Sequence, residues 1–340
     1  MKESMEKTVS TETNAVKAAI EVRDLSVEYH SGGSVVRAVN HVSFTLASGR
    51  SLGLVGETGA GKTSTALALM RLLPERVSHV PSGEIYLKGD NIMTIPESHM
   101  KLMRGEIISM IFQDPMTALN PIMTVGNQIR EAVKIHAGKK MSKAEIDQRV
   151  DDVLEMVGIP AQRKHDYPLQ FSGGMKQRVV IAIALACSPD ILIADEPTTA
   201  LDVTIQAQVL ALIEELKQRL GTSMIMISHD LGVVVRTCDD VGIMYAGEII
   251  EFGSVEQIYS PGDHHPYTTG LFSAIPNIKS KVKRLTPIDG LMPDPTNLPT
   301  GCKFSPRCPH CTEKCRQVEP AEYVKDGHRI KCHLYGGNEA

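Results

Sequence analysis

The glycine-rich stretch Gly56-Glu57-Thr58-Gly59-Ala60-Gly61-Lys62-Thr63 constrains this chain more than any other segment. It matches the phosphate-loop pattern G-x-x-x-x-G-K-[ST]. The four residues before the stretch have the apolar character of a short buried strand, and residues 64–70 predict a helix that ends before Pro74. A strand, a glycine loop and a helix in this order are the context that the motif requires, because backbone N–H groups and the positive end of the helix then face a phosphate chain.

Two side chains of this loop carry the chemistry. We expect Lys62 to reach the β- and γ-phosphates and the Thr63 hydroxyl to ligate Mg²⁺. The other positions are expected to surround the phosphates, mainly with backbone N–H groups: Gly56, Glu57, Thr58, Gly59, Ala60, Gly61 and Ser64. A glycine-rich turn without a ligand is the alternative, and the flanking strand and helix argue against it.

The composition excludes several classes of protein. A chain of 340 residues that is 42% hydrophobic and 22% charged can bury a large core. Its net charge of −4 argues against a nucleic-acid partner. The longest uncharged apolar run, residues 179–187, is too short to span a bilayer, and residues 1–17 lack the apolar core of a signal peptide. We therefore expect a disordered tail over residues 1–18, a cytoplasmic location, and membrane contact only through partners.

Two alternating segments precede the phosphate loop. Residues 20–29 alternate apolar and polar side chains, and residues 35–46 give a further strand pattern, so a small antiparallel β-layer is expected. Tyr29 ends the first of these segments, where its ring could either stack on a purine base or pack on the surface. Its position ahead of a phosphate loop favours the base.

Apolar strands after the loop end in polar residues. Residues 107–112 end at Gln113, which is thereby expected at the carboxyl edge of a sheet, where open α/β sheets bind ligands. Residues 191–194 lead into Asp195 and Glu196, the Walker B pattern, which predicts a Mg²⁺ ligand and a group acting on water near the γ-phosphate. Residues 223–227 are a further buried strand, and His229 follows it as a γ-phosphate contact or an ordinary loop histidine.

A helical insert separates Gln113 from the Walker B strand. The apolar residues between 124 and 169 recur with helical period, so a helical subdomain is expected over about residues 114–180. Ser172-Gly173-Gly174 precedes a helix expected from about Lys176 to Ala186, and such a start favours anions, although it is a weak indication alone. Asp202 follows Glu196 six residues later.

The order of these motifs along about residues 19–260 resembles the nucleotide-binding domain of the ABC transporter family. The order is phosphate loop, Gln113, Ser172-Gly173-Gly174, Asp195-Glu196, Asp202 and His229. The resemblance implies an α/β fold with a mixed central sheet, an antiparallel β-layer and a helical subdomain. It further implies that two such domains meet head to tail, with ATP at the joint.

The resemblance also implies roles for individual residues. Tyr29 would stack on adenine, Gln113 would touch Mg²⁺ and the attacking water, Glu196 would be the general base, and His229 would contact the γ-phosphate. Ser172, Gly173 and Gly174 would clamp the γ-phosphate bound by the opposite subunit, and Asp202 would lie in a loop that crosses the joint. Met175 departs from the pattern, because the family usually has glutamine there.

The C-terminal region, residues 261–340, resembles the extension of the peptide/nickel-type importer ATPases in its segments 265–272 and 298–308. This implies an ATP-hydrolysing subunit that energises import of oligopeptides or dipeptides at the cytoplasmic face of the membrane. The implied partners are a companion ATPase, two transmembrane permeases and an extracytoplasmic substrate-binding protein. Nickel or another small solute is an alternative cargo, and a soluble ABC ATPase or a metal-sensing regulator is an alternative class.

Five cysteines cluster in this extension. The resemblance implies that Cys302, Cys308, Cys315 and Cys332 hold a [4Fe–4S] cluster that staples the extension, whereas Cys311 is an extra cysteine of uncertain role. Spacing alone leaves zinc and free thiols open. Nearby His310, His328 and His333 are expected to be solvated or to support the ligands from a second layer.

Overall fold

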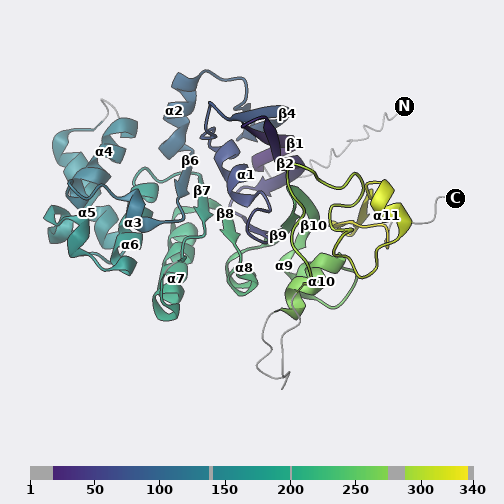
Figure 1. Ribbon diagram of the computed structural model, residues 1–340. Helices are drawn as coiled ribbons and strands as arrows, with labels where there is room; N and C mark the ends of the chain where they lie inside the picture. Colours follow the sequence, from purple (N-terminus) through teal and green to yellow (C-terminus); the bar gives the residue numbers. More distant parts are fainter. Residues whose placement is uncertain (1–17, 138–140, 200, 275–287, 336–340) are drawn as a thin grey trace, which may run out of the picture.

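The structure, a computed structural model, describes residues 18–136 with the backbone of 137, and residues 141–199, 201–274 and 288–335. Figure 1 shows the helices α4 (Val125–Ala137), α5 (Lys143–Met156) and α6 (Gly173–Leu185) at one end of the molecule and α11 (Glu313–Gln317) at the other. The strands of the main sheet lie between these ends. The expected tail, residues 1–18, falls outside the described residues except for Ala18.

The main sheet has the strand order β11-β12-β10-β9-β3-β8-β7-β6. Its parallel part consists of β3 (Ser51–Val55), β6 (Ile108–Ile111), β7 (Ile191–Asp195), β8 (Ser223–Ser228) and β9 (Asp240–Tyr245). Nearly every residue of these strands is buried, as expected for a parallel sheet covered on both faces. Their carboxyl ends therefore meet at one edge, which positions the candidate site.

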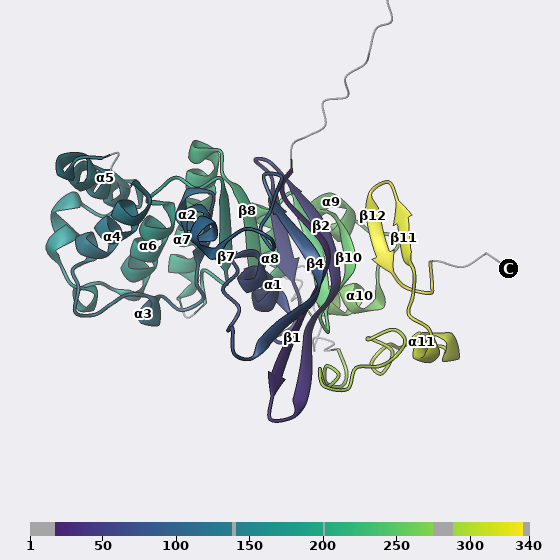
Figure 2. The same cartoon turned by 90° about the horizontal axis from the view of Figure 1, so that it is seen from above.

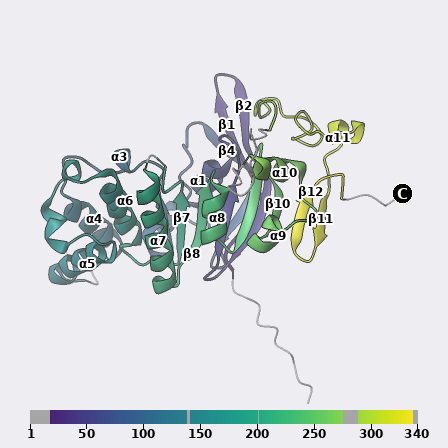
Figure 3. The same cartoon turned by 90° about the horizontal axis from the view of Figure 1, so that it is seen from below.

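Helices pack along this parallel part. They are α1 (Lys62–Leu69), α7 (Val203–Leu220) and α8 (Leu231–Thr237), and Figure 3 shows α7 and α8 beside β7 and β8. Helix α2 (Glu97–Glu106) precedes β6. The N-caps of α7 and α8 are aspartates whose side chains accept backbone N–H groups, which fixes where these helices begin.

The second sheet is the expected antiparallel β-layer. It contains β1 (Ala18–Ser31), β2 (Ser34–Ala47), β4 (Ser78–Leu87) and the short β5 (Asp90–Asn91), in the order β2-β1-β4-β5. Its inward residues, such as Ile20 and Leu25, share one hydrophobic core with Leu52 and Leu54 of β3. The predicted mixed sheet, β-layer and helical subdomain are all confirmed.

The helical subdomain has its own core. Besides α4, α5 and α6 it includes α3 (Pro115–Ala118) and the short 3₁₀ segments Ala161–His165 and Pro168–Gln170. The predicted periodic residues Ile129, Val133, Val150 and Val153 are buried together. Helix α6 begins at Gly173, earlier than the expected Lys176, because the Ser172 hydroxyl accepts the Met175 N–H at 3.4 Å and caps the helix.

The C-terminal extension joins the main sheet. β10 (Glu248–Ser254) forms a hairpin with β9. β12 (His328–Lys331) then pairs antiparallel with β10 and with β11 (Glu322–Lys325), as Figure 2 shows. Between them lie α9 (Val255–Tyr259) and α10 (Pro266–Ser273). Tyr267 and Phe304 pack on Tyr245 of β9, with ring centroids 4.7 and 5.2 Å away. Within the described ranges, no helix is long and apolar enough to cross a membrane.

Candidate active site

A cavity of about 520 Å³ opens at the carboxyl edge of the parallel strands. It is lined by ten of the eighteen residues that the sequence placed at a nucleotide site, together with three that it did not single out. The lining residues are Tyr29, Val36, Ala38, Thr58, Gly59, Gly61, Lys62, Thr63, Ser64, Gln113, Glu196, His229 and Pro295.

The shape of the phosphate loop depends on two of its glycines. Gly61 has φ of 102°, which disfavours residues with a side chain, and a Cβ atom there would lie 2.3 Å from the Ala38 carbonyl oxygen. A Cβ at Gly56 would lie 2.2 Å from the Met244 carbonyl oxygen. The loop is therefore wedged between β2 and β9, and Ala60 closes it by accepting a hydrogen bond from Gly247 N–H at 3.0 Å.

Lys62 crosses the inside of this loop. Its Nζ donates to the carbonyl oxygens of Gly56, at 2.7 Å, and Glu57, at 3.0 Å. Burial lowers the pKa of Lys62, and the carboxylates of Glu196, Asp195 and Glu57 act against that shift. A buried ammonium among phosphate-facing N–H groups is suited to bind the β- and γ-phosphates.

Thr63 and Asp195 form a site suited to Mg²⁺. The Thr63 hydroxyl donates to Asp195 Oδ1 at 3.3 Å, and Asp195 ends the buried strand β7. Burial raises the pKa of Asp195, while the hydrogen bond from Thr63 opposes that shift. Hydroxyl and carboxylate oxygens are the hard donors that Mg²⁺ prefers, so the donor set fits the expected ion.

The three predicted catalytic residues meet at Glu196. Gln113 Nε2 and the Thr199 hydroxyl each donate to Glu196 Oε2 at 2.9 Å. His229 Nδ1 lies 3.4 Å from Oε1, and the His229 side chain is 64% exposed. Glu196 also has φ of 45°, an unusual value for a residue with a side chain, and its N–H donates to Ile227 O at 2.9 Å. A carboxylate held from three sides at the cavity edge is oriented to act on water.

Tyr29 lines the same cavity. Its hydroxyl donates to Ser64 Oγ at 3.2 Å, which ties its side chain to the first turn of α1. Pro295, from the C-terminal extension, lines the same cavity and accepts a hydrogen bond from Arg37 N–H at 3.0 Å. Sequence reasoning missed Pro295, because nothing local in the chain relates residue 295 to residue 29.

Ser172, Gly173, Gly174 and Asp202 are not among the residues that line this cavity. They lie together instead. Asp202 Oδ1 accepts the Ile205 N–H at 3.0 Å as the N-cap of α7, and a Cβ at Gly174 would lie 2.6 Å from Ile205 Cγ2. Met175, the departure from the family pattern, packs beside the helical core and accepts a contact from Arg163 Nη1 at 3.4 Å. Ser172, Gly173 and Gly174 thus lie at the start of α6. With Asp202 they form a second patch, separate from the phosphate loop of the same chain.

The extension contacts the phosphate loop directly. Arg307 donates to Glu57 through Nη1 to Oε2, at 2.9 Å, and through Nη2 to Oε1, at 3.2 Å. The Tyr267 hydroxyl accepts the Glu57 N–H at 3.1 Å. The Arg307 side chain is only 5% exposed. Sequence reasoning missed both partners, although a glutamate inside a phosphate loop is a charge that needs a nearby cation.

Comparisons with known proteins agree with this geometry. The ABC transporter model matches residues 39–199, and the model of the oligopeptide/dipeptide transporter C-terminal region matches residues 250–315. The chain is 47% identical to the dipeptide transport ATP-binding protein DppD of Bacillus subtilis, over 94% of this chain and 95% of that protein. It is 46% identical to the oligopeptide transport ATP-binding protein OppD of Salmonella typhimurium, over 97% of each.

The chain belongs to the ATP-binding proteins of peptide-type ABC transporters. Hydrolysis of ATP coupled to transport is the activity of this family. Among solved structures, cbiO1 from Clostridium perfringens, part of the ABC transporter complex cbiONQ, is 27% identical with a TM-score of 0.62, over 72% of this chain and 92% of that one. The bacterial ABC transporter cassette MJ0796, solved as a dimer, is 25% identical with the same TM-score, over 69% and 98%.

The cysteines of the C-terminal extension do not form a compact ligand set in the part of the chain that the structure describes. Burial raises the pKa of Cys302 to about 12, with smaller contributions from the thiols of Cys332, Cys308 and Cys315. The Cys311 thiol is instead directed to its neighbour Thr312 O, at 3.5 Å. Among the described residues, no three cysteine sulfurs lie within 4.8 Å of one another. The metal staple therefore stays a prediction.

His328 and His333 hydrogen-bond to groups other than these thiols. His328 Nε2 bonds to Glu251 Oε1 at 2.8 Å, and His333 Nε2 bonds to Val318 O at 2.9 Å. His328 is half-buried rather than solvated, and its hydrogen bond joins β12 to β10.

Proposed function

We propose that this ABC ATP-binding protein hydrolyses Mg²⁺-ATP to energise import of oligopeptides or dipeptides, acting at the cytoplasmic face of the membrane. The observation that carries the hydrolytic part is Glu196, held by Gln113, Thr199 and His229 at the edge of the cavity that contains Lys62 and Thr63. The peptide part is supported by similarity to DppD and OppD over nearly the full chain and by the C-terminal match over residues 250–315.

The proposed reaction needs positioning and charge neutralisation rather than a covalent intermediate. Tyr29 holds the adenine, and Lys62 with the loop N–H groups holds the phosphates. Glu196 accepts a proton from the water that attacks the γ-phosphorus, while His229 contacts the γ-phosphate. When bound, Mg²⁺ would be held by Thr63 and Asp195, with the amide oxygen of Gln113, and would neutralise phosphate charge.

The second patch, Ser172 to Gly174 with Asp202, requires a second ATPase subunit in this proposal. Its place at the start of α6, separate from the phosphate loop of the same chain, supports a role on the nucleotide of the opposite subunit. The solved cassette MJ0796 is itself dimeric. We propose a companion ATPase, two transmembrane permeases and an extracytoplasmic substrate-binding protein as partners. Residues 19–260 would form the motor and residues 261–340 the appended extension.

We further propose a [4Fe–4S] cluster on Cys302, Cys308, Cys315 and Cys332. A [4Fe–4S] cluster takes one thiolate on each of its four irons, so these four cysteines supply the full ligand set. When bound, the cluster would cross-link the proline-rich extension. Iron and acid-labile sulfide analysis after anaerobic purification tests this, and zinc or no metal would contradict it.

Uptake assays on a strain that lacks the gene test the main proposal. Complementation with the wild-type chain should restore uptake of labelled dipeptides or oligopeptides, whereas an E196Q chain should not. Nickel uptake measured in parallel tests the alternative cargo. Loss of nickel uptake with peptide uptake unchanged would overturn the solute assignment, and uptake restored by E196Q would overturn the role of Glu196.

A further inference from the structure

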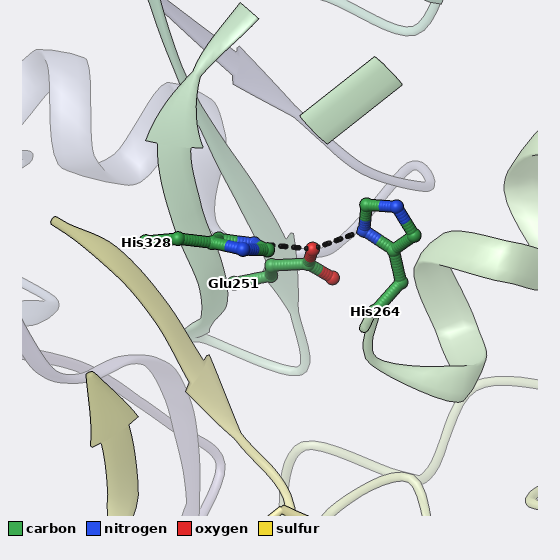
Figure 4. A group of neighbouring side chains, drawn as sticks. All are labelled: Glu251, His264 and His328. Carbon is green, nitrogen blue, oxygen red and sulfur yellow. Dashed lines mark hydrogen bonds and ion pairs between the residues drawn. The ribbon is translucent and has the colours of Figure 1, made fainter. Parts of the chain in front are cut away.

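A buried carboxylate lies between two histidine rings at the junction of the ATPase sheet and the C-terminal extension. Glu251 is on β10, His264 precedes α10, and His328 is on β12, as Figure 4 shows. Glu251 Oε1 lies 2.7 Å from His264 Nδ1 and 2.8 Å from His328 Nε2. The Glu251 side chain is fully buried, and the histidine side chains are 11% and 14% exposed.

The hydrogen bond of His264 Nε2 determines whether Nδ1 can donate a hydrogen to Glu251. His264 Nε2 is 2.7 Å from the carbonyl oxygen of Ser260. A carbonyl oxygen only accepts, so Nε2 carries a hydrogen. In neutral His264, Nδ1 then presents a lone pair to a carboxylate oxygen at 2.7 Å. That arrangement is repulsive inside a protein, so a cation must lie between the two atoms: a proton or a metal ion.

The hydrogen bonds around His264 and Glu251 are those of a typical metal-binding histidine and carboxylate. Histidines that ligate metals usually donate their other ring N–H to a backbone carbonyl or carboxylate, as His264 does to Ser260. Glu251 Oε2 accepts the His265 N–H at 2.8 Å, which fixes the carboxylate and leaves Oε1 facing both imidazoles. Two imidazole nitrogens and one carboxylate oxygen are a ligand set for Zn²⁺ and related ions.

The spacing and the access are compatible with an ion. Ligands bonded at about 2.1 Å lie about 3.0–3.4 Å from one another, so the two nitrogens would have to move from Oε1 by a few tenths of an ångström. Both histidines line a cavity of about 200 Å³. Asp263, Asp326 and Lys325 line the same cavity, so its carboxylates outnumber its cations once His264 has lost its Nδ1 hydrogen. An ion therefore has an entry path and a favourable field.

We propose that Glu251, His264 and His328 form a structural site for a divalent transition ion of the zinc class. The ion ties β10, the segment before α10, and β12 together, and so fastens the end of the extension to the ATPase sheet. This site is distinct from the cysteines and from the nucleotide cavity, and it does not depend on the proposed transport function.

The proton balance follows from the ligands. Without metal, Glu251 is a carboxylate and His264 carries hydrogens on both nitrogens, because its Nδ1 and Nε2 each face an oxygen acceptor. With metal, Nδ1 of His264 binds the ion and only the Nε2 hydrogen stays. His264 therefore releases one proton for each ion bound.

Zn²⁺ binding to the full chain tests the site. Equilibrium dialysis is compared for wild type, H264Q, H328Q and the control H99Q, whose histidine is exposed on α2. All four chains keep the same cysteines, so their difference isolates this site. We expect one fewer ion per chain, or binding weaker by about 100-fold or more, in H264Q and H328Q only. In a weakly buffered solution, wild type should release one more proton than H264Q.

Equal Zn²⁺ content and affinity in all four chains would overturn the proposal and leave a hydrogen-bonded ion pair only. If the histidine variants fail to fold, Co²⁺ bound to wild type decides. An absorption spectrum of nitrogen and oxygen ligation, in addition to any thiolate charge-transfer band, supports the site, and cobalt bound to thiolates alone overturns it. Loss of Zn²⁺ binding with normal peptide uptake would separate this site from the transport function.

Discussion

The ion pair between Arg307 and Glu57 should control how well the phosphate loop binds ATP. Arg307 of the extension holds both carboxylate oxygens of Glu57 in the loop, and Tyr267 holds the backbone N–H of the same residue. The substitution R307Q removes both charged contacts. The loop should then populate conformations that do not fit the phosphates, which lowers its apparent affinity for ATP.

The magnitude follows from burial. Removing one partner of a buried ion pair costs about 3–5 kcal/mol. The Glu57 side chain is 32% exposed, so water partly solvates the unpaired carboxylate, and we expect a cost of about 1–3 kcal/mol. Only the part of this free energy that keeps the phosphate loop in its binding conformation affects ATP affinity. If that part is about 1–2 kcal/mol, R307Q should bind ATP about 5- to 30-fold more weakly than wild type.

The assay compares equilibrium binding of Mg²⁺-ATP and thermal unfolding in matched variants. E57Q removes the pair but keeps the Arg307 bonds to the carbonyl oxygens of Asp289, at 2.9 Å, and Ile288, at 3.3 Å, so its fold is retained. The control R329Q removes an extension arginine that stacks on Phe252, 4.4 Å from the ring centroid, and does not contact the loop. R329Q should lower stability without weakening ATP binding.

A double-mutant cycle gives the decisive result. R307Q, E57Q and the double variant should weaken ATP binding by similar factors, because each breaks the same pair. If R307Q and E57Q bind ATP as wild type does while unfolding at lower temperature, the pair only stabilises the fold. The inferred link between the extension and the nucleotide would then be wrong.

Further predictions concern the cavity and the sheet. E196Q should lower ATP turnover by about 10²- to 10⁴-fold with ATP binding retained, measured by phosphate release, and near-normal turnover would contradict the base role. Y29A should weaken ATP binding by about 1–3 kcal/mol, whereas Y29F, which loses only the bond to Ser64, should change it little. Although burial raises the pKa of Asp239, two 2.7 Å hydrogen bonds from Ser51 hold it below its usual value. A carboxylate whose pKa is lower in the folded than in the unfolded chain stabilises the fold at pH values above the unfolded-state pKa. In urea denaturation, D239N should therefore lower the free energy of unfolding by about 1 kcal/mol at pH 7 and by less near pH 3. An equal loss at both pH values would refute this.

Local sequence patterns were sufficient for most of the active site. The phosphate loop, the strand ending in Asp195 and Glu196, and the strands leading to Gln113 and His229 are each defined by fewer than about ten consecutive residues. Parallel strands place their carboxyl ends at one edge, so identifying the strands also predicts which polar residues meet. The structure brings Lys62, Gln113, Glu196 and His229 to a single cavity, and Asp195 lies behind it, 3.3 Å from the Thr63 hydroxyl.

Local sequence patterns did not predict which neighbouring groups hold the active-site residues in place. Thr199, which donates to Glu196, is close in sequence, but its role depends on the turn that follows β7. The start of α6 at Gly173 was predicted three residues too late, because the capping serine, rather than the apolar period, determines where this helix begins.

The sequence by itself determined the class of fold, the nucleotide chemistry and the clustering of cysteines, because each depends on short-range spacing. Only the tertiary structure decided that the extension adds β12 to the main sheet, that Arg307 reaches Glu57, and that His264 and His328 meet at Glu251. These contacts join residues 13 to 250 positions apart in the chain. Side-chain periodicity reports which face of an element is buried, but it does not report which distant segment covers that face.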